Sequence, residues 1–92
     1  MFDQAYRYRF ADSDHLHEAQ KTLRLAMVAA EGIFGEAQVQ MDAASVIDET
    51  IDVVVIDAST PVGKVINKVF TIFCLREFGP RAFQVVRVEG LA

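Results

Sequence analysis

The sequence predicts an α+β domain with two layers, a four-stranded antiparallel sheet and two helices on one of its faces. Three observations carry this prediction. Residues 6–10 alternate between aromatic and arginine side chains, the two-residue period of a strand. Residues 53–56 are four consecutive β-branched residues, so we expect this strand at the centre of the sheet, covered at least partly on both faces. Residues 13–32 and 61–78 carry apolar side chains at helical spacing.

Length and composition limit the chain to one small domain. Residues 1–92 are 52% hydrophobic and contain no linker, so we expect a single core. The formal net charge of -4 argues against a nucleic-acid partner, because such surfaces need Lys and Arg to neutralise phosphates. No segment is long and apolar enough to span a bilayer, and the amino terminus lacks signal-peptide features. We therefore expect a cytoplasmic protein without a membrane partner.

The first strand and helix follow from residues 6–34. In the strand, the three aromatic rings are expected to face the core, while Arg7 and Arg9 face solvent. Residues 12–14 offer several N-caps for the helix. Its apolar stripe consists of Leu16, Ala19, Leu23, Ala26, Met27 and Ala30. Gly32 is expected to end this helix.

Residues 36–42 alternate again, which predicts a second strand. Its inward residues would be Ala37, Val39 and Met41, and its outward residues Gln38 and Gln40. Residues 43–50 leave two interpretations open: a continuation of that strand past a bulge, or a turn at residues 48–50. A hairpin into the central strand, residues 51–58, is the simpler one.

The second helix is predicted from Pro61 to about Phe78. Ser59 or Thr60 can cap its amino terminus, and proline suits a first helical position. Gly79-Pro80 ends it. Cys74, the only cysteine, lies in its apolar part and is expected to be a reduced packing residue.

A last strand, residues 82–88, alternates irregularly, which is typical of an edge or a bulge. The order strand, helix, strand, strand, helix, strand over roughly residues 5–89 resembles the ferredoxin-like fold. That resemblance implies strand order 4-1-3-2, with the first and third strands at the centre and both helices on one face. Because this fold hosts many unrelated activities, it implies no particular function.

Polar residues follow both central strands. We expect the carboxyl ends of these strands to point the same way, so that Asp12-Ser13-Asp14-His15 and Asp57-Ala58-Ser59-Thr60 meet at one end of the sheet. The candidate ligand-binding residues there are Asp12, His15, Asp57, Ser59, Thr60, Lys64 and Arg81. Two helix amino termini and two cations suit a small anion. The alternative is that the hydroxyl and carboxyl side chains only cap their helices, which is their commoner role.

No metal or cofactor is expected. His15 and His17 are two residues apart on a helix and point in nearly opposite directions. Gly63-Lys64 follows a strand, but the other residues of a phosphate loop are missing. The aromatic first strand is similar to that of RNA-recognition motifs, but the third strand lacks their basic and aromatic signature.

The apolar surface of the second helix predicts a homo-oligomer, at least a dimer. Phe70, Leu75 and Phe78 lie off its main stripe and would form the contact, or else the open face of the sheet would. Residues 43–50 or the tail 90–92 are the alternative cover for this helix within one copy.

Two functions remain open from the sequence. The first is a non-enzymatic module for homo-oligomeric association or small-ligand binding. The second is a small dimeric enzyme of the ferredoxin-like type, with Asp57 or His15 as its acid or base. A cleft that contains Asp57 would favour the enzyme, and a capped, filled end of the sheet would favour the module.

Overall fold

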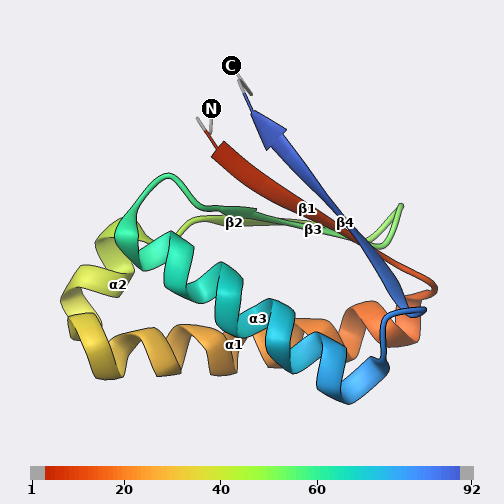
Figure 1. Cartoon of the computed structure of the whole chain (residues 1–92), viewed down its shortest axis with the longest axis horizontal. Helices are drawn as coiled ribbons and strands as arrows, with labels where there is room; N and C mark the ends of the chain where they lie inside the picture. Colours follow the sequence, from red (N-terminus) through yellow and green to blue (C-terminus); the bar gives the residue numbers. More distant parts are fainter. Residues whose placement is uncertain (1–3, 90–92) are drawn as a thin grey trace.

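A computed structural model describes residues 4–89 (Figure 1). The elements in chain order are β1 (Gln4–Phe10), α1 (Ser13–Phe34), α2 (Glu36–Asp42), β2 (Ser45–Asp48), β3 (Val53–Asp57), α3 (Pro61–Phe78) and β4 (Phe83–Glu89). The sheet forms one layer, and the helices form the other. Among the described residues, no helix is long and apolar enough to cross a membrane.

The sheet has the predicted strand order, which reads β2-β3-β1-β4 across its width. Every neighbouring pair is antiparallel. β1 and β3 occupy the centre, and β4 is an edge strand, as predicted. The two-layer arrangement and this order confirm the ferredoxin-like topology. Three helices pack against the sheet instead of the expected two, because α2 is an addition to the predicted pattern.

The prediction of a strand over residues 36–42 is wrong, because this segment is helix α2. Only Val39 of the three expected inward residues is buried, and Met41 is 79% exposed. The glutamines form side-chain hydrogen bonds one helical turn away, Gln38 with Asp42 and Gln40 with Glu36. Glu, Ala, Gln and Met all favour helices, and this propensity prevails over the alternation. The actual β2 is the short segment Ser45–Asp48, followed by the predicted turn.

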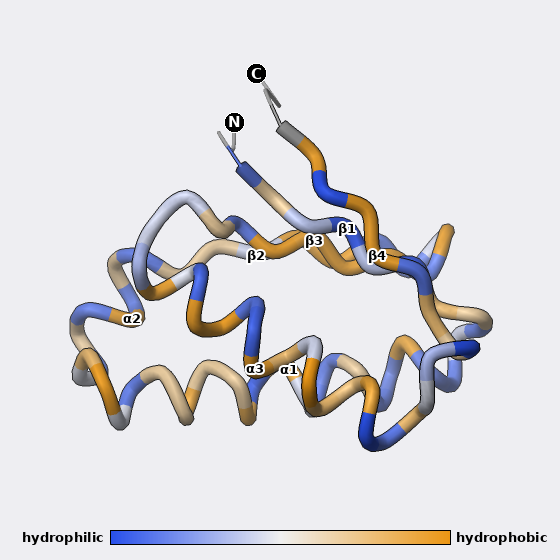
Figure 2. The backbone as a smooth tube through the Cα atoms, viewed as in Figure 1, coloured by the Kyte–Doolittle hydropathy of each residue, from blue (hydrophilic) through white to orange (hydrophobic). Residues whose placement is uncertain are grey.

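The core lies between the sheet and helices α1 and α3, where apolar segments of both layers face each other (Figure 2). β1 contributes the buried rings of Tyr8 and Phe10, whereas Arg7 and Arg9 are exposed, as predicted. Phe70 of α3 packs edge-on against Tyr8, with 4.8 Å between the ring centroids. The core is therefore centred on aromatic contacts between β1 and α3.

Two of the three helix residues expected at a dimer contact belong to this core. Phe70 is completely buried, so the expectation that it faces a partner is wrong. Phe78 is partly buried against Phe10 and His15. Leu75 remains 44% exposed. The tail 90–92, which was an alternative cover for this helix, lies outside the described residues.

The ends of the long helices depend on glycine. Helix α1 extends to Phe34, two residues past the expected Gly32, because Gly35 adopts the positive φ of 86° that ends it. Helix α3 has the predicted bounds and ends at Gly79, with φ of 80°. Cys74 is buried in α3, and burial raises the pKa of its thiol to about 12, as suits a packing residue.

Candidate functional site

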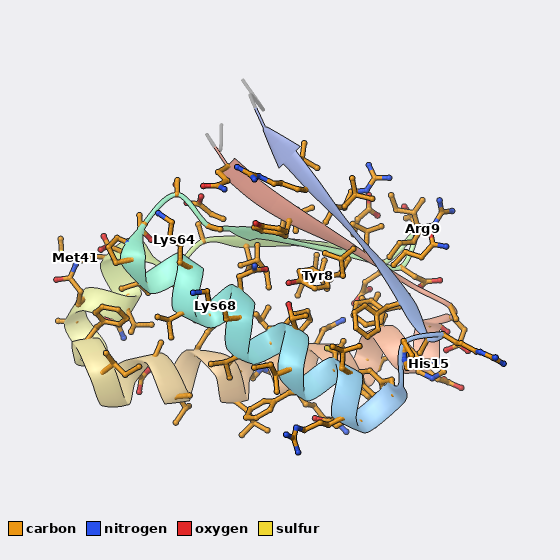
Figure 3. All side chains as sticks on the ribbon, in the orientation of Figure 1. Tyr8, Arg9, His15, Met41, Lys64 and Lys68 are labelled. Carbon is orange, nitrogen blue, oxygen red and sulfur yellow. The ribbon has the colours of Figure 1, made fainter. Side chains whose placement is uncertain are left out.

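The seven predicted site residues do not meet at one place. β1 and β3 run antiparallel, with Ala5 opposite Asp57 and Arg9 opposite Val53. The carboxyl end of β1 therefore lies at the opposite end of the sheet from that of β3. In Figure 3, His15 and Arg9 lie at one end of the molecule and Lys64 at the other. The predicted convergence is wrong, because β3 returns from a hairpin with β2 and so opposes β1.

At the first end, Asp12 is the N-cap of α1. Its Oδ1 accepts hydrogen bonds from the backbone N–H and from Nδ1 of His15, both at 2.8 Å. The hydrogen bond from the backbone N–H of His15 is the main reason why the pKa of the Asp12 carboxyl is lowered. Arg81 lies near the start of β4, beside a polar groove that it lines together with Arg9. Asp12 and His15 are thus already paired with each other as a helix cap.

At the other end, Asp57, Ser59 and Thr60 build the turn into α3. Oδ1 of Asp57 accepts hydrogen bonds from N–H and Oγ of Ser59, at 2.9 and 2.6 Å. Oγ1 of Thr60 accepts from the backbone N–H of Gly63 at 3.0 Å and donates to the carbonyl of Asp42. Thr60 therefore caps α3, as the capping alternative predicts, and Asp57 fixes the turn before it by binding Ser59.

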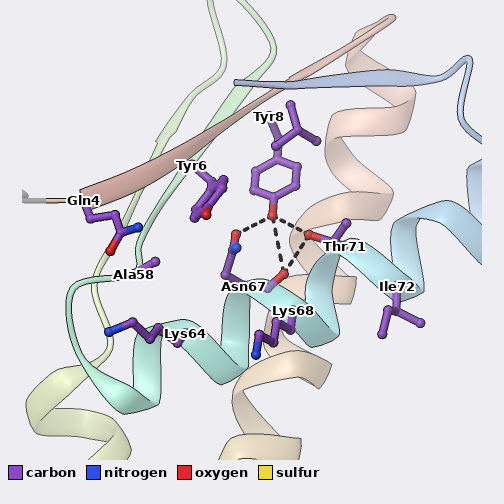
Figure 4. Close-up of a pocket in the computed structure, with 10 residues that line it drawn as sticks. Gln4, Tyr6, Tyr8, Ala58, Lys64, Asn67, Lys68, Thr71 and Ile72 are labelled. Carbon is purple, nitrogen blue, oxygen red and sulfur yellow. Dashed lines mark hydrogen bonds between the residues drawn. The ribbon is translucent and has the colours of Figure 1, made fainter. Parts of the chain in front are cut away.

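A different region holds a pocket of about 650 Å³ between α3, the central strand β1 and the edge strand β4 (Figure 4). The amino-terminal half of β1 and the carboxyl-terminal half of β4 rise away from α3 there (Figure 1). The pocket is lined by Gln4, Tyr6, Tyr8, Ala58, Lys64, Asn67, Lys68, Thr71, Ile72 and Val85. Of the seven predicted residues, only Lys64 lines it.

One wall of the pocket is a hydrogen-bonded cluster of Tyr8, Asn67 and Thr71. The Tyr8 hydroxyl points from β1 to α3, donates to Oδ1 of Asn67 and lies 2.5 Å from Oγ1 of Thr71. The Thr71 hydroxyl is also 2.7 Å from the backbone carbonyl of Asn67. Burial raises the pKa of Tyr8 to about 12. The cluster therefore holds a neutral tyrosine in a fixed orientation at the pocket wall.

The other lining groups are apolar or cationic. Tyr6, Ile72 and Val85 present apolar surface, and both aliphatic side chains are more than a third exposed. Lys64 and Lys68 project from α3 at the exposed rim. None of the lining residues that the structure describes is Asp, Glu, His or Cys. This composition suits noncovalent binding of an organic molecule more than acid–base or nucleophilic chemistry.

The sequence contained two signals for this pocket. Lys64, Asn67, Lys68 and Thr71 recur at positions i, i+3, i+4 and i+7, the stripe that one side of a helix presents. By itself, this stripe predicts no more than the polar face of an amphipathic helix. Tyr6 and Tyr8 were assigned to the core, although their hydroxyls need polar partners when they are buried. A polar helix stripe together with strand tyrosines is the combination that could have indicated the pocket.

No cation site accompanies the pocket. Within residues 4–89, no group of three or more His, Cys, Asp or Glu side chains is placed to hold a metal ion. Comparison with known proteins found no matching family model, no matching curated protein and no matching solved structure. The assignment of this pocket as the candidate site therefore depends on its shape and its lining residues alone.

Proposed function

We propose that this chain is a non-enzymatic module that binds a small organic ligand in the pocket between α3 and strands β1 and β4. The observation that carries the proposal is the pocket itself. Its volume of about 650 Å³ lies within the range of about 300 to 1,000 Å³ that is common for ligand sites. Its apolar walls and few fixed polar groups match the usual composition of such sites.

Binding rather than catalysis is supported by the state of the innermost hydroxyl. With a pKa of about 12, Tyr8 keeps its proton at neutral pH and cannot act as a base there. Its proton is donated to the side-chain oxygen Oδ1 of Asn67. The Tyr8 hydroxyl thus serves to orient Asn67 and Thr71, which both line the pocket.

The alternative of an enzyme that uses Asp57 or His15 receives less support. The two residues lie at opposite ends of the sheet, so one copy of the chain cannot combine them. The carboxylate of Asp57 is nearly buried and accepts two hydrogen bonds from Ser59. His15 pairs with Asp12 and packs edge-on against Phe78.

Self-association is the second part of the proposal, and the open face of the sheet supports it. The strand registers align Val46, Val55, Arg7 and Val86 in one row across all four strands. Val46 and Val86 are 47% and 54% exposed. The next row contains both Arg9 and Asp48, so a second copy offers the opposite charge to each. We therefore propose a dimer through this face, with Leu75 as the alternative contact.

Ligand binding can be tested with the protein's own fluorescence. Both of its tyrosines line the pocket and it has no tryptophan, so a bound ligand should change the tyrosine emission directly. We expect saturable changes, and a rise in melting temperature, with some members of a library of small organic molecules. Val85→Asp should abolish them, because it places a charge in the apolar wall.

The matched control is Val28→Asp. Val28 is also an exposed valine, but it lies on α1, outside both the pocket lining and the open face of the sheet. It should leave binding intact. Equal loss of binding in both variants, or no saturable signal from any compound with the unmodified protein, would refute the proposed pocket.

A further inference from the structure

One side of α3 directs two cations at the pocket. Lys64 and Lys68 are one helical turn apart, which places their Cβ atoms about 5 to 6 Å from each other. Asn67 and Thr71 lie between and beside them on the same stripe. Two flexible ammonium groups at this spacing can contact the same acidic group from both sides, while the Asn67 side-chain amide N–H can donate a hydrogen bond nearby.

These charges have no counterpart inside the site. Of the residues within 4–89 that line the pocket, two are lysines and none is acidic. No carboxylate among the described side chains forms an ion pair with Lys64 or Lys68, whereas Lys21 pairs with Glu18. The chain as a whole carries a formal charge of -4, so this pocket is locally positive in a protein whose net charge is negative. An anionic ligand supplies the missing charge.

Polarity changes along the pocket. Gln4, Ala58 and Lys64 lie where α3 begins, whereas Ile72 lies further along the helix. Val85 of β4 lines the pocket from the position opposite Tyr8 and adds a second apolar side chain. Lys64 and Ile72 are eight residues apart, or about 12 Å along the helix axis. Ile72 is 51% exposed and Val85 is 40% exposed. A ligand that covers them needs an apolar body beyond its charged group.

We infer that the ligand is an amphipathic organic anion, whose acidic head lies between Lys64 and Lys68 and whose apolar body lies along Ile72 and Val85. This inference rests on the proposed function, since it names the class of ligand for the same pocket. Neither a free inorganic anion nor a neutral apolar compound satisfies both halves of the site.

Three probes of similar shape and different charge test the inference: octanoate, octanol and octylamine. Tyrosine fluorescence and melting temperature report binding of each one to the full chain. We expect octanoate to bind about tenfold more tightly than octanol, and octylamine to bind most weakly, because two lysines attract the first and repel the last. Added salt should weaken octanoate binding and leave octanol binding nearly unchanged.

The double substitution Lys64→Gln and Lys68→Gln should remove the advantage of octanoate, weakening it about tenfold while octanol is unaffected. Lys21→Gln is the matched control, since Lys21 is the remaining lysine of the chain and is exposed on α1, outside the pocket lining. If octanol or octylamine binds as tightly as octanoate, or the double variant keeps its preference, the inference is wrong while the pocket stands. If neither these probes nor the wider library bind, the proposed function itself is wrong.

Discussion

Replacing Gly63 by alanine tests the contact on which the position of α3 depends. Gly63 is in the first turn of α3, and a Cβ added there would lie 2.1 Å from the backbone oxygen of Asp57 and 3.1 Å from its carbonyl carbon. The close atom belongs to the backbone, so no rotation of a side chain can relieve the clash. The helix start and the end of β3 must separate to admit the methyl group.

The magnitude follows from two opposing effects. Overpacking of this kind costs about 1 to 3 kcal/mol, and a clash with backbone belongs at the upper end of that range. Alanine in place of a helical glycine stabilises the helix by about 0.5 to 1 kcal/mol, which offsets part of this cost. We therefore expect Gly63→Ala to lower the free energy of unfolding by about 2 kcal/mol. For a domain of this size, that corresponds to a decrease of roughly 10 °C in melting temperature.

The assay is urea unfolding followed by circular dichroism at neutral pH. Gly32→Ala is the control, because Gly32 also lies in a helix but an added Cβ there meets nothing within 4 Å. This control should be as stable as the unmodified protein or more stable by about 0.5 kcal/mol. If Gly63→Ala proves equally stable, the close packing of α3 on the end of β3 is not as described.

Five further predictions concern pH, the thiol and assembly. In a Tyr6→Phe variant, Tyr8 is the only tyrosine and its phenolate absorbance should appear near pH 12; a midpoint near pH 10 would contradict its burial. The raised pKa of Tyr8 adds about 2 to 3 kcal/mol to the free energy of unfolding below pH 10, and this contribution is lost as the pH rises to 12. Tyr8→Phe should remove this pH dependence in urea unfolding. The pKa of Asp12 is lowered, so its contribution is present above about pH 4 and lost as the pH falls; Asp12→Ala should destabilise the protein at pH 7 more than at pH 3. Cys74 should react with a thiol reagent only after unfolding, and rapid labelling of the native protein would show that it is accessible. Light scattering should give a mass above 10.2 kDa that Val46→Asp reduces to 10.2 kDa with circular dichroism unchanged; a mass of 10.2 kDa at every concentration would exclude the dimer.

Periodicity and end signals predicted most of the fold. The bounds of α3 are those of the sequence prediction, because Thr60 and Pro61 mark its start and Gly79 its end. Prediction failed at Glu36–Asp42, where seven residues fit a short strand and a short helix equally well by pattern. The helix propensity of these residues decided between them, and the positive φ of Gly35 lets the chain turn from α1 into this second helix.

The candidate site was less predictable than the fold, and the failure has a specific cause. The expected convergence depended on the relative direction of β1 and β3, which no local pattern encodes. Lys64 was a candidate because it is a cation near a helix start, but the pocket that it lines extends from that start along α3 to Ile72. Tyr8 reaches Asn67 across 59 positions of the chain, and this pairing depends on the packing of α3 over β1.

The pocket is a consequence of how the two layers meet. On the core side of the sheet, Ile47, Val54, Tyr8 and Val85 lie opposite one another in one row across the four strands. The two central residues are fully buried, whereas the edge residues Ile47 and Val85 are 39% and 40% exposed. A sheet twists by roughly 20 to 25° from each strand to the next, so the last strand turns away from helices that pack on the centre. The divergence of β4 from α3 in Figure 1 follows this twist and leaves apolar side chains without cover from the helices. Because Lys64 and Lys68 border the same gap, a ligand that fills it with apolar surface also meets two positive charges, and this coincidence is the basis for assigning the pocket to an amphipathic anion.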